Sequence, residues 1–170
     1  GNDPGAVGYV VEKKVAVKVV RYMKEYLQNN YVCSLKLSKG TTDLSGRCQE
    51  ANRWKADLFV SVHFNAGGGD GYEALVYSAA NEKLGRCFEK YVKAVKQNSR
   101  GVKYRPDLAV LRLTNMKSIL NEVAFVDNRK DIKDWDENSE LKVMGEALAK
   151  AAADWLNLPA VSRSCIAQYS

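Results

Sequence analysis

The chain has 170 residues, of which 46% are hydrophobic and 27% charged, the balance of an ordinary soluble globular protein. Its 12 Gly and 3 Pro exclude a collagen-like or low-complexity chain, and no apolar run approaches the roughly 18–20 residues that span a bilayer. The 26 Lys and Arg exceed the 20 Asp and Glu, and the net charge of +6 favours polyanionic surroundings such as nucleic acid, anionic lipid or acidic wall polymers. A basic surface with no special partner explains this charge at least as well.

Hydrophobic periodicity predicts a helix, a strand and a second helix at the start of the chain. Apolar side chains recur at three- and four-residue steps over residues 12–29, which is typical of an amphipathic helix. Residues 31–37 alternate as in a short strand. After a turn at residues 39–42, a second helix is expected over residues 43–54.

The rest of the sequence interleaves compact apolar runs with helical patterns. Residues 57–64 form the most apolar run, the pattern of a strand buried on both faces. Further strands are predicted at residues 72–78, 108–113 and 118–125, helices at residues 81–97 and 139–156, and a polar connection around Arg100. With an initial strand expected before Gly1, this order predicts an α/β fold whose mostly parallel sheet has about six strands and helices on both faces.

One domain is expected over residues 1–158, with residues 159–170 as a linker or tail, because Pro159 ends the last helical pattern. Residues 1–8 resemble a loop rather than a signal peptide, and the domain is expected to lack its first strand. The four cysteines, at positions 33, 48, 87 and 165, contain no C-x-x-C pair and are interpreted as reduced, mostly buried thiols.

Three side chains could carry chemistry. His63 is the single histidine and ends the most apolar strand, where α/β sheets place their ligands, although a half-buried histidine bonded to backbone is the alternative. Glu122 interrupts an apolar run, so it needs a partner or a cleft; a salt-bridged buried Glu or a strand with one wet face would also explain it. Glu12 alone would be an ordinary first-turn carboxylate. His63 and Glu12 together resemble part of a His₂Glu zinc set.

Five stretches of the sequence, in order and at compatible spacing, resemble the zinc-dependent N-acetylmuramoyl-L-alanine amidases of the type-3 class, which occur as bacterial autolysins and phage endolysins. The resemblance covers about residues 1–156. The stretches are GNDPGA at residues 1–6 with Glu12-Lys13, LSGR at 44–47 with Ala51-Asn52, ADLFVSVHFNA at 56–66 with GYE at 71–73, RGVK at 100–103 with Leu111-Arg112, and LNEVAFVDN at 120–128.

The resemblance implies metal-assisted hydrolysis of the amide between N-acetylmuramic acid and L-alanine in peptidoglycan. Glu12 and His63 would be zinc ligands and Glu122 the catalytic carboxylate. The family's remaining ligand is a histidine two residues upstream of the position of Gly1, and this sequence does not contain it. For Asn65 and Arg112, binding of the substrate and a purely structural role are equally good interpretations.

Glu73 and Arg47 are interpreted as scaffold residues rather than catalytic ones. Because one ligand is absent from the sequence, a non-catalytic wall-binding or regulatory domain on the same fold is the alternative function. The expected partners are peptidoglycan and anionic wall polymers, with no membrane and no nucleic acid, since no element combines clustered Lys/Arg with interleaved aromatics. The site of action would be the bacterial cell wall, reached by secretion or, for a phage endolysin, by release from the host cytoplasm.

Overall fold

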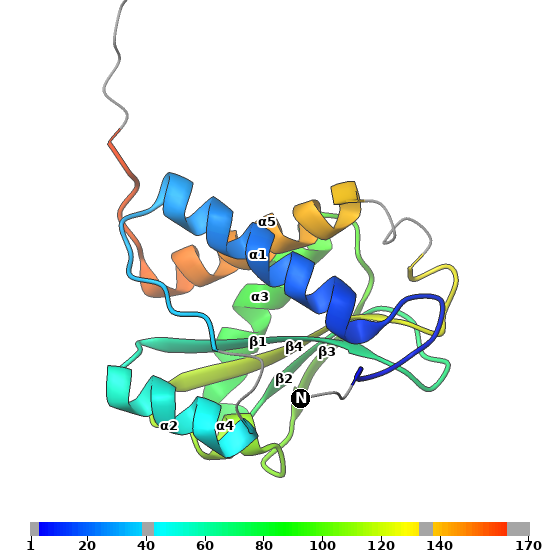
Figure 1. The fold of residues 1–170 in the computed structure, drawn as a ribbon, viewed down its shortest axis with the longest axis horizontal. Coiled ribbons are helices and arrows are strands. Elements are labelled where there is room, and N and C mark those ends of the chain that lie inside the picture. The colour runs from blue at the N-terminus through cyan, green and yellow to red at the C-terminus, as the bar shows by residue number, and fades with distance from the viewer. Residues whose placement is uncertain (1–3, 39–42, 133–137, 163–170) are drawn as a thin grey trace, which may run out of the picture.

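The computed structural model describes residues 4–38, 43–132 and 138–162, in which a four-stranded sheet lies between two layers of helices (Figure 1). In chain order the elements are α1 (Glu12–Asn30), α2 (Leu44–Trp54), β1 (Leu58–Asn65), β2 (Tyr72–Val76), the short 3₁₀ helix η1 (Ala79–Asn81), α3 (Glu82–Ala94), β3 (Ser99–Tyr104), α4 (Ala109–Arg112), β4 (Lys117–Phe125) and α5 (Asn138–Leu156). Within this part of the chain, no helix is both long and apolar enough to cross a membrane.

The sheet is mixed, with the strand order β1-β4-β2-β3. β1 pairs with β4 and β2 with β3 in parallel, whereas β2 and β4 are antiparallel. Two of these three pairings are parallel, but the described residues form four strands in a mixed sheet, so the prediction of about six strands in a mostly parallel sheet is confirmed only in part. β4 lies between β1 and β2 and runs antiparallel to β2, so the chain reverses direction between β3 and β4.

Each face of the sheet has its own hydrophobic core. α1, α3 and α5 cover one face, where Val19, Phe88 and Leu148 are fully buried together. α2 and α4 cover part of the other face, where Cys48 and Leu111 pack in a smaller cluster. The α/β class with helices on both faces is thus confirmed.

The four long helices begin and end close to the predicted residues because their apolar stripes are continuous. In α1, buried side chains recur every four residues, at Val15, Val19, Met23 and Leu27. Asp43 caps α2, since its Oδ1 accepts a hydrogen bond from the Gly46 amide at 2.6 Å.

Three predicted elements are wrong. Residues 31–37 form no strand: Tyr31 makes a single bridge with Ala160, and residues 32–37 have no ladder partner among the described residues. Residues 108–113 contain the helix α4 instead of a strand. The expected polar connection around Arg100 is the strand β3.

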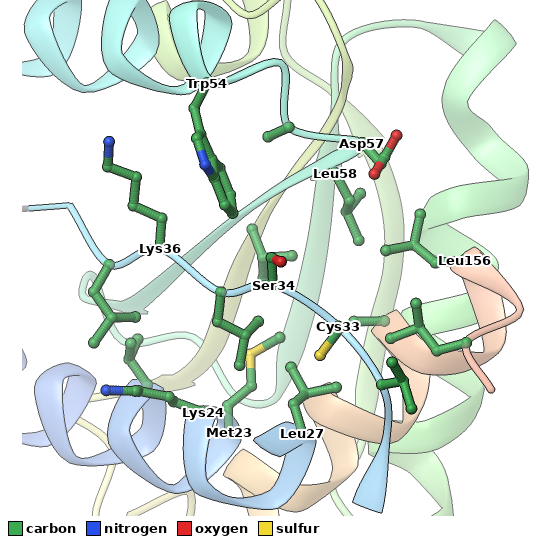
Figure 2. A pocket seen from close by; sticks show the side chains of 18 of the residues that line it. Met23, Lys24, Leu27, Cys33, Ser34, Lys36, Trp54, Asp57, Leu58 and Leu156 are labelled. Carbon is green, nitrogen blue, oxygen red and sulfur yellow. The ribbon is translucent and has the colours of Figure 1, made fainter. Parts of the chain in front are cut away.

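A cavity of about 570 Å³ separates residues 32–37 from the sheet. It lies between α1, residues 32–37 and the outer edge of β1, so the extended segment is separated from the strand with which it would pair (Figure 2). Leu58, Val60 and Val62 of β1 line this cavity. The initial strand expected before Gly1 lies outside the described residues.

Cys33, Cys48 and Cys87 are free thiols, as predicted, but of these three only Cys48 is buried, and Cys165 lies outside the described residues. Most of the predicted tail also lies outside, but its first residues return to α1. Val32 donates a backbone hydrogen bond to Pro159, and Val161 donates one to Asn30. The domain boundary at residue 158 stays a prediction.

Candidate active site

A row of polar side chains crosses three strands of the sheet. His63 of β1 is the register partner of Glu122 of β4, and Glu122 is the register partner of Glu73 of β2. Side chains two residues apart on a strand share a face, so this row lies on the same face as Leu120 and Leu75, which pack in the cluster under α2 and α4. The row continues this face beyond that cluster, and the His63 side chain is 34% exposed.

Glu12 meets His63 at one end of the row. The first residue of α1 points its carboxylate at the end of β1, and Glu12 Oε1 lies 2.8 Å from His63 Nδ1. The Ala6 amide donates to Glu12 Oε2 at 2.7 Å. Burial pushes the pKa of Glu12 upwards, but the hydrogen bonds from His63 and Ala6 outweigh it, so the pKa is lowered and the carboxylate stays ionised. His63 Nε2 lies 3.0 Å from the Ser61 hydroxyl.

The loop before α1 needs a glycine at this point. Gly5 has a φ of +71°, and a Cβ there would approach Glu12 Oε2 to 2.3 Å. The backbone therefore lies directly against the carboxylate, and a side chain at position 5 would displace it.

Glu122 in the middle of the row is a half-buried residue whose carboxyl group has a raised pKa. Its Oε2 is buried and has no hydrogen-bond partner among the described residues. Burial raises the pKa to about 7, the charges of Glu12 and Glu73 add to the increase, and those of His63 and Arg105 oppose it. A carboxyl group that titrates near neutral pH beside polar neighbours is suited to general acid–base chemistry.

Glu12 and His63 have the ligand atoms that zinc prefers, but they are fewer than the three protein ligands of a usual catalytic zinc site. An imidazole nitrogen and a carboxylate oxygen are both common zinc ligands, and a catalytic zinc usually takes three protein ligands. Glu12 and His63 supply two converging donors. Within the described part of the chain, no group of three or more His, Cys, Asp or Glu side chains could hold a metal ion.

The two predicted substrate-binding residues, Asn65 and Arg112, lie on different elements of the fold. Asn65 ends β1, two residues beyond His63, and its Oδ1 accepts from the Ala66 amide at 2.8 Å, which supports the structural alternative. Arg112 ends α4 and is exposed.

Two aspartates shape the glycine-rich loop that follows β1. Asp127 Oδ2 accepts from the Gly67 and Gly68 amides at 2.8 and 2.9 Å. Asp131, only 5% exposed, accepts from the amides of Gly71 and Phe125. These contacts fix the loop beside His63. Sequence analysis did not predict either role, although Asp127 belongs to the last of the five stretches.

The sequence interpretation of Glu73 also missed its place in the row. Glu73 is 6% exposed and accepts hydrogen bonds from both Arg100 and Lys103 of β3. Burial pushes its pKa upwards, but these two cations outweigh burial and lower it. The signal in the sequence was an acidic residue inside an apolar run, as for Glu122.

Comparison with known proteins agrees with this geometry. Residues 1–154 match the family described as N-acetylmuramoyl-L-alanine amidase, and the chain belongs to that family. It is 35% identical to the endolysin of Bacillus phage SPP1, covering 93% of this chain and 63% of the relative, and 31% identical to the N-acetylmuramoyl-L-alanine amidase CwlM of Bacillus licheniformis, covering 93% and 66%. The chain thus spans just under two thirds of the length of these two relatives.

A solved structure shows the same fold. The catalytic domain of CwlV, an N-acetylmuramoyl-L-alanine amidase from Bacillus (Paenibacillus) polymyxa var. colistinus, superposes with a TM-score of 0.86 at 24% identity, and the match covers 94% of each chain. Family membership and fold therefore confirm the resemblance found in the sequence.

Proposed function

We propose that this chain hydrolyses the amide between N-acetylmuramic acid and L-alanine of peptidoglycan with the help of zinc. The observation that carries the proposal is the buried Oε2 of Glu122, which has no hydrogen-bond partner among the described residues and lies on the strand next to His63, the partner of Glu12. The names of the two relatives, an endolysin and an N-acetylmuramoyl-L-alanine amidase, support the same substrate.

Glu12 and His63 would hold the zinc, with a third ligand from outside the described residues. When bound, zinc lowers the pKa of a water ligand to about 7 and polarises a carbonyl. Hydrogen bonds from His63 and the Ala6 amide lower the pKa of Glu12 and keep it ionised, and the Ala6 amide orients its carboxylate for this role.

Glu122 would move the proton. Its carboxylate takes a proton from the water that attacks the amide carbon, and the protonated acid then returns that proton to the leaving nitrogen of L-alanine. A pKa of about 7 suits both steps, because the group gains and loses a proton at little cost near neutral pH. Asn65 and Arg112 would contact the substrate.

A second candidate function follows from the donor count. Two protein ligands bind zinc weakly, so a non-catalytic wall-binding or regulatory domain is favoured if the chain holds no metal. In either case peptidoglycan is the proposed partner, with anionic wall polymers as a further one, and the bacterial cell wall is the proposed site of action.

One experiment tests the catalytic proposal. Zinc-loaded protein is incubated with purified cell walls, and released stem peptides are quantified for the parent, Glu122→Gln and the exposed control Glu25→Gln. We expect Glu122→Gln to lower the rate about 10²–10⁴-fold, the usual contribution of general acid–base catalysis, and the control to match the parent.

The outcomes separate the two functions. Retained hydrolysis in Glu122→Gln would remove Glu122 from the mechanism. A parent protein that binds cell walls but contains no zinc by metal analysis and releases no peptide would favour the binding domain.

A further inference from the structure

Two cations, Arg100 and Lys103, lie at the end of the polar row and bind the buried carboxylate of Glu73, although one would neutralise its charge. Arg100 and Lys103 both donate to the same oxygen, Glu73 Oε1. One cation would neutralise Glu73, so the three side chains together carry a net charge of +1. The Glu73 side chain is 8% exposed, whereas those of Arg100 and Lys103 are 42% and 41% exposed. The surplus positive charge therefore faces solvent.

Arg100 has hydrogen-bonding capacity left and a fixed orientation. Only its Nε bonds to Glu73, and within the described residues its two terminal nitrogens have no acceptor. The guanidinium carbon lies 5.3 Å from the centre of the Phe125 ring, a cation–π contact at the end of β4. A guanidinium with two free terminal nitrogens is the standard partner for bidentate recognition of a carboxylate.

The sheet register places these cations beside the proposed catalytic carboxylate. Glu73 and Glu122 are directly opposite on antiparallel strands, where Cβ atoms lie about 4.5–5.5 Å apart. Lys103 pairs in register with Leu75, whose partner on β4 is Leu120, two residues before Glu122. The order across the sheet is therefore the Glu12–His63 pair, then Glu122, then the cations.

We propose that Arg100 and Lys103 bind a carboxylate of the substrate's peptide on the leaving-amine side of the scissile amide. This inference rests on the proposed function, because Glu122 hands its proton to the leaving nitrogen and the cations lie beyond Glu122 from the Glu12–His63 pair. Glu73 acts as a positioning residue that holds both cations beside Glu122. An anionic peptide is thus preferred over its neutral amide.

The test is equilibrium binding, which does not need hydrolysis. Isothermal titration calorimetry compares two L-alanyl peptides that differ only in whether the residue after L-alanine carries a carboxylate or the primary amide. We expect the parent to bind the carboxylate peptide about tenfold more tightly. Arg100→Gln should reduce this ratio to near one, and Arg100→Lys should restore part of it. Arg86→Gln on α3, which pairs with Glu82 and Glu89, is the matched control and should keep the parent ratio.

Separate measurements distinguish a loss of peptide binding from a loss of folding or of hydrolysis. Arg100→Gln leaves Lys103 to neutralise Glu73, and circular dichroism confirms that the variant is folded. Equal affinity of the parent for both peptides, or an equal loss for both peptides in Arg100→Gln, would overturn the proposal. With the corresponding muramoyl peptides as substrates, the same preference should appear in KM rather than kcat. If the parent hydrolyses neither, the proposed function fails, while the binding ratio still decides the subsite.

Discussion

A carboxylate that is shielded from water and lacks a hydrogen-bond partner favours its protonated form, and Glu122 shows the consequence at a single residue. In the folded chain its pKa is about 7 against an ordinary value of 4.5, chiefly because of burial. Between these two pH values the unfolded chain releases the proton while the folded chain retains it. The position that suits proton transfer therefore costs folding stability as the pH rises.

Replacing Glu122 with Gln should remove this cost in the metal-free protein. With a chelator present, we expect Glu122→Gln to match the parent near pH 4 and to become more stable by on the order of 2–3 kcal/mol above pH 7, since one pKa unit corresponds to about 1.4 kcal/mol. Urea unfolding at several pH values measures the difference. A difference that does not change with pH would show that Glu122 has an ordinary pKa in the folded chain.

The sequence pointed to Glu122 more clearly than to its neighbours. A glutamate inside an apolar strand marks a buried charge, and that pattern is visible without a structure. The same pattern surrounds Glu73, but its meaning depends on the strand order, which sets Glu73 opposite Glu122. Glu12 carries no pattern of its own; only the approach of α1 to the end of β1 brings it to His63.

At the scale of elements, the contact between α1 and α5 depends on a glycine. A Cβ on Gly145 would approach the Val19 carbonyl oxygen and the Tyr22 Cβ to 2.7 Å each. Backbone atoms cannot move aside as a flexible side chain can. Gly145 therefore allows the two helices to pack closely over the sheet.

Gly145→Ala should reverse the usual effect of this substitution. In an open helix position Ala stabilises by up to about 1 kcal/mol relative to Gly, whereas overpacking costs roughly 1–3 kcal/mol. We expect a net loss of about 1–2 kcal/mol, or about 2–8 °C in Tm for a chain of this length. Thermal unfolding followed by circular dichroism measures it, with the exposed α5 substitution Lys142→Ala as control. An unchanged or higher Tm would mean that the helices lie further apart.

Helices were predictable from sequence where an apolar stripe is long, and strands were less so. The four-residue spacing of buried side chains in α1 is typical of a helix alone, and the ends of α1 agree with the predicted residues 12–29 within one residue. Residues 108–113 are as apolar as a strand, yet Val110 and Leu111 are buried from a single helical turn. β3 contains the polar residues Arg100 and Lys103, which donate hydrogen bonds to Glu73, so its sequence does not show the apolar pattern of a strand. Residues 31–37 alternate correctly but lie across a cavity from β1.

At the scale of the whole molecule, the net charge of +6 acts beyond any single contact. A basic protein is concentrated near an anionic polymer by long-range attraction, and salt screens this attraction over about 10 Å at 0.1 M and about 3 Å at 1 M. Chemistry at Glu122 and the Glu12–His63 pair is short-range. Salt should therefore separate attraction to the wall from hydrolysis of the bond.

This separation gives a prediction about substrates of different size. We expect hydrolysis of intact, polyanionic cell walls to fall several-fold between about 50 mM and 500 mM NaCl, and that of a soluble muramoyl peptide to change much less. Replacing the exposed residues Lys83, Lys117 and Lys142 by Glu changes the net charge by −2 each, which brings +6 to zero. This triple variant should lose the salt dependence on walls while its rate on the small substrate stays at the parent value. A parent rate on walls that is independent of salt would show that the basic surface has no part in reaching the substrate.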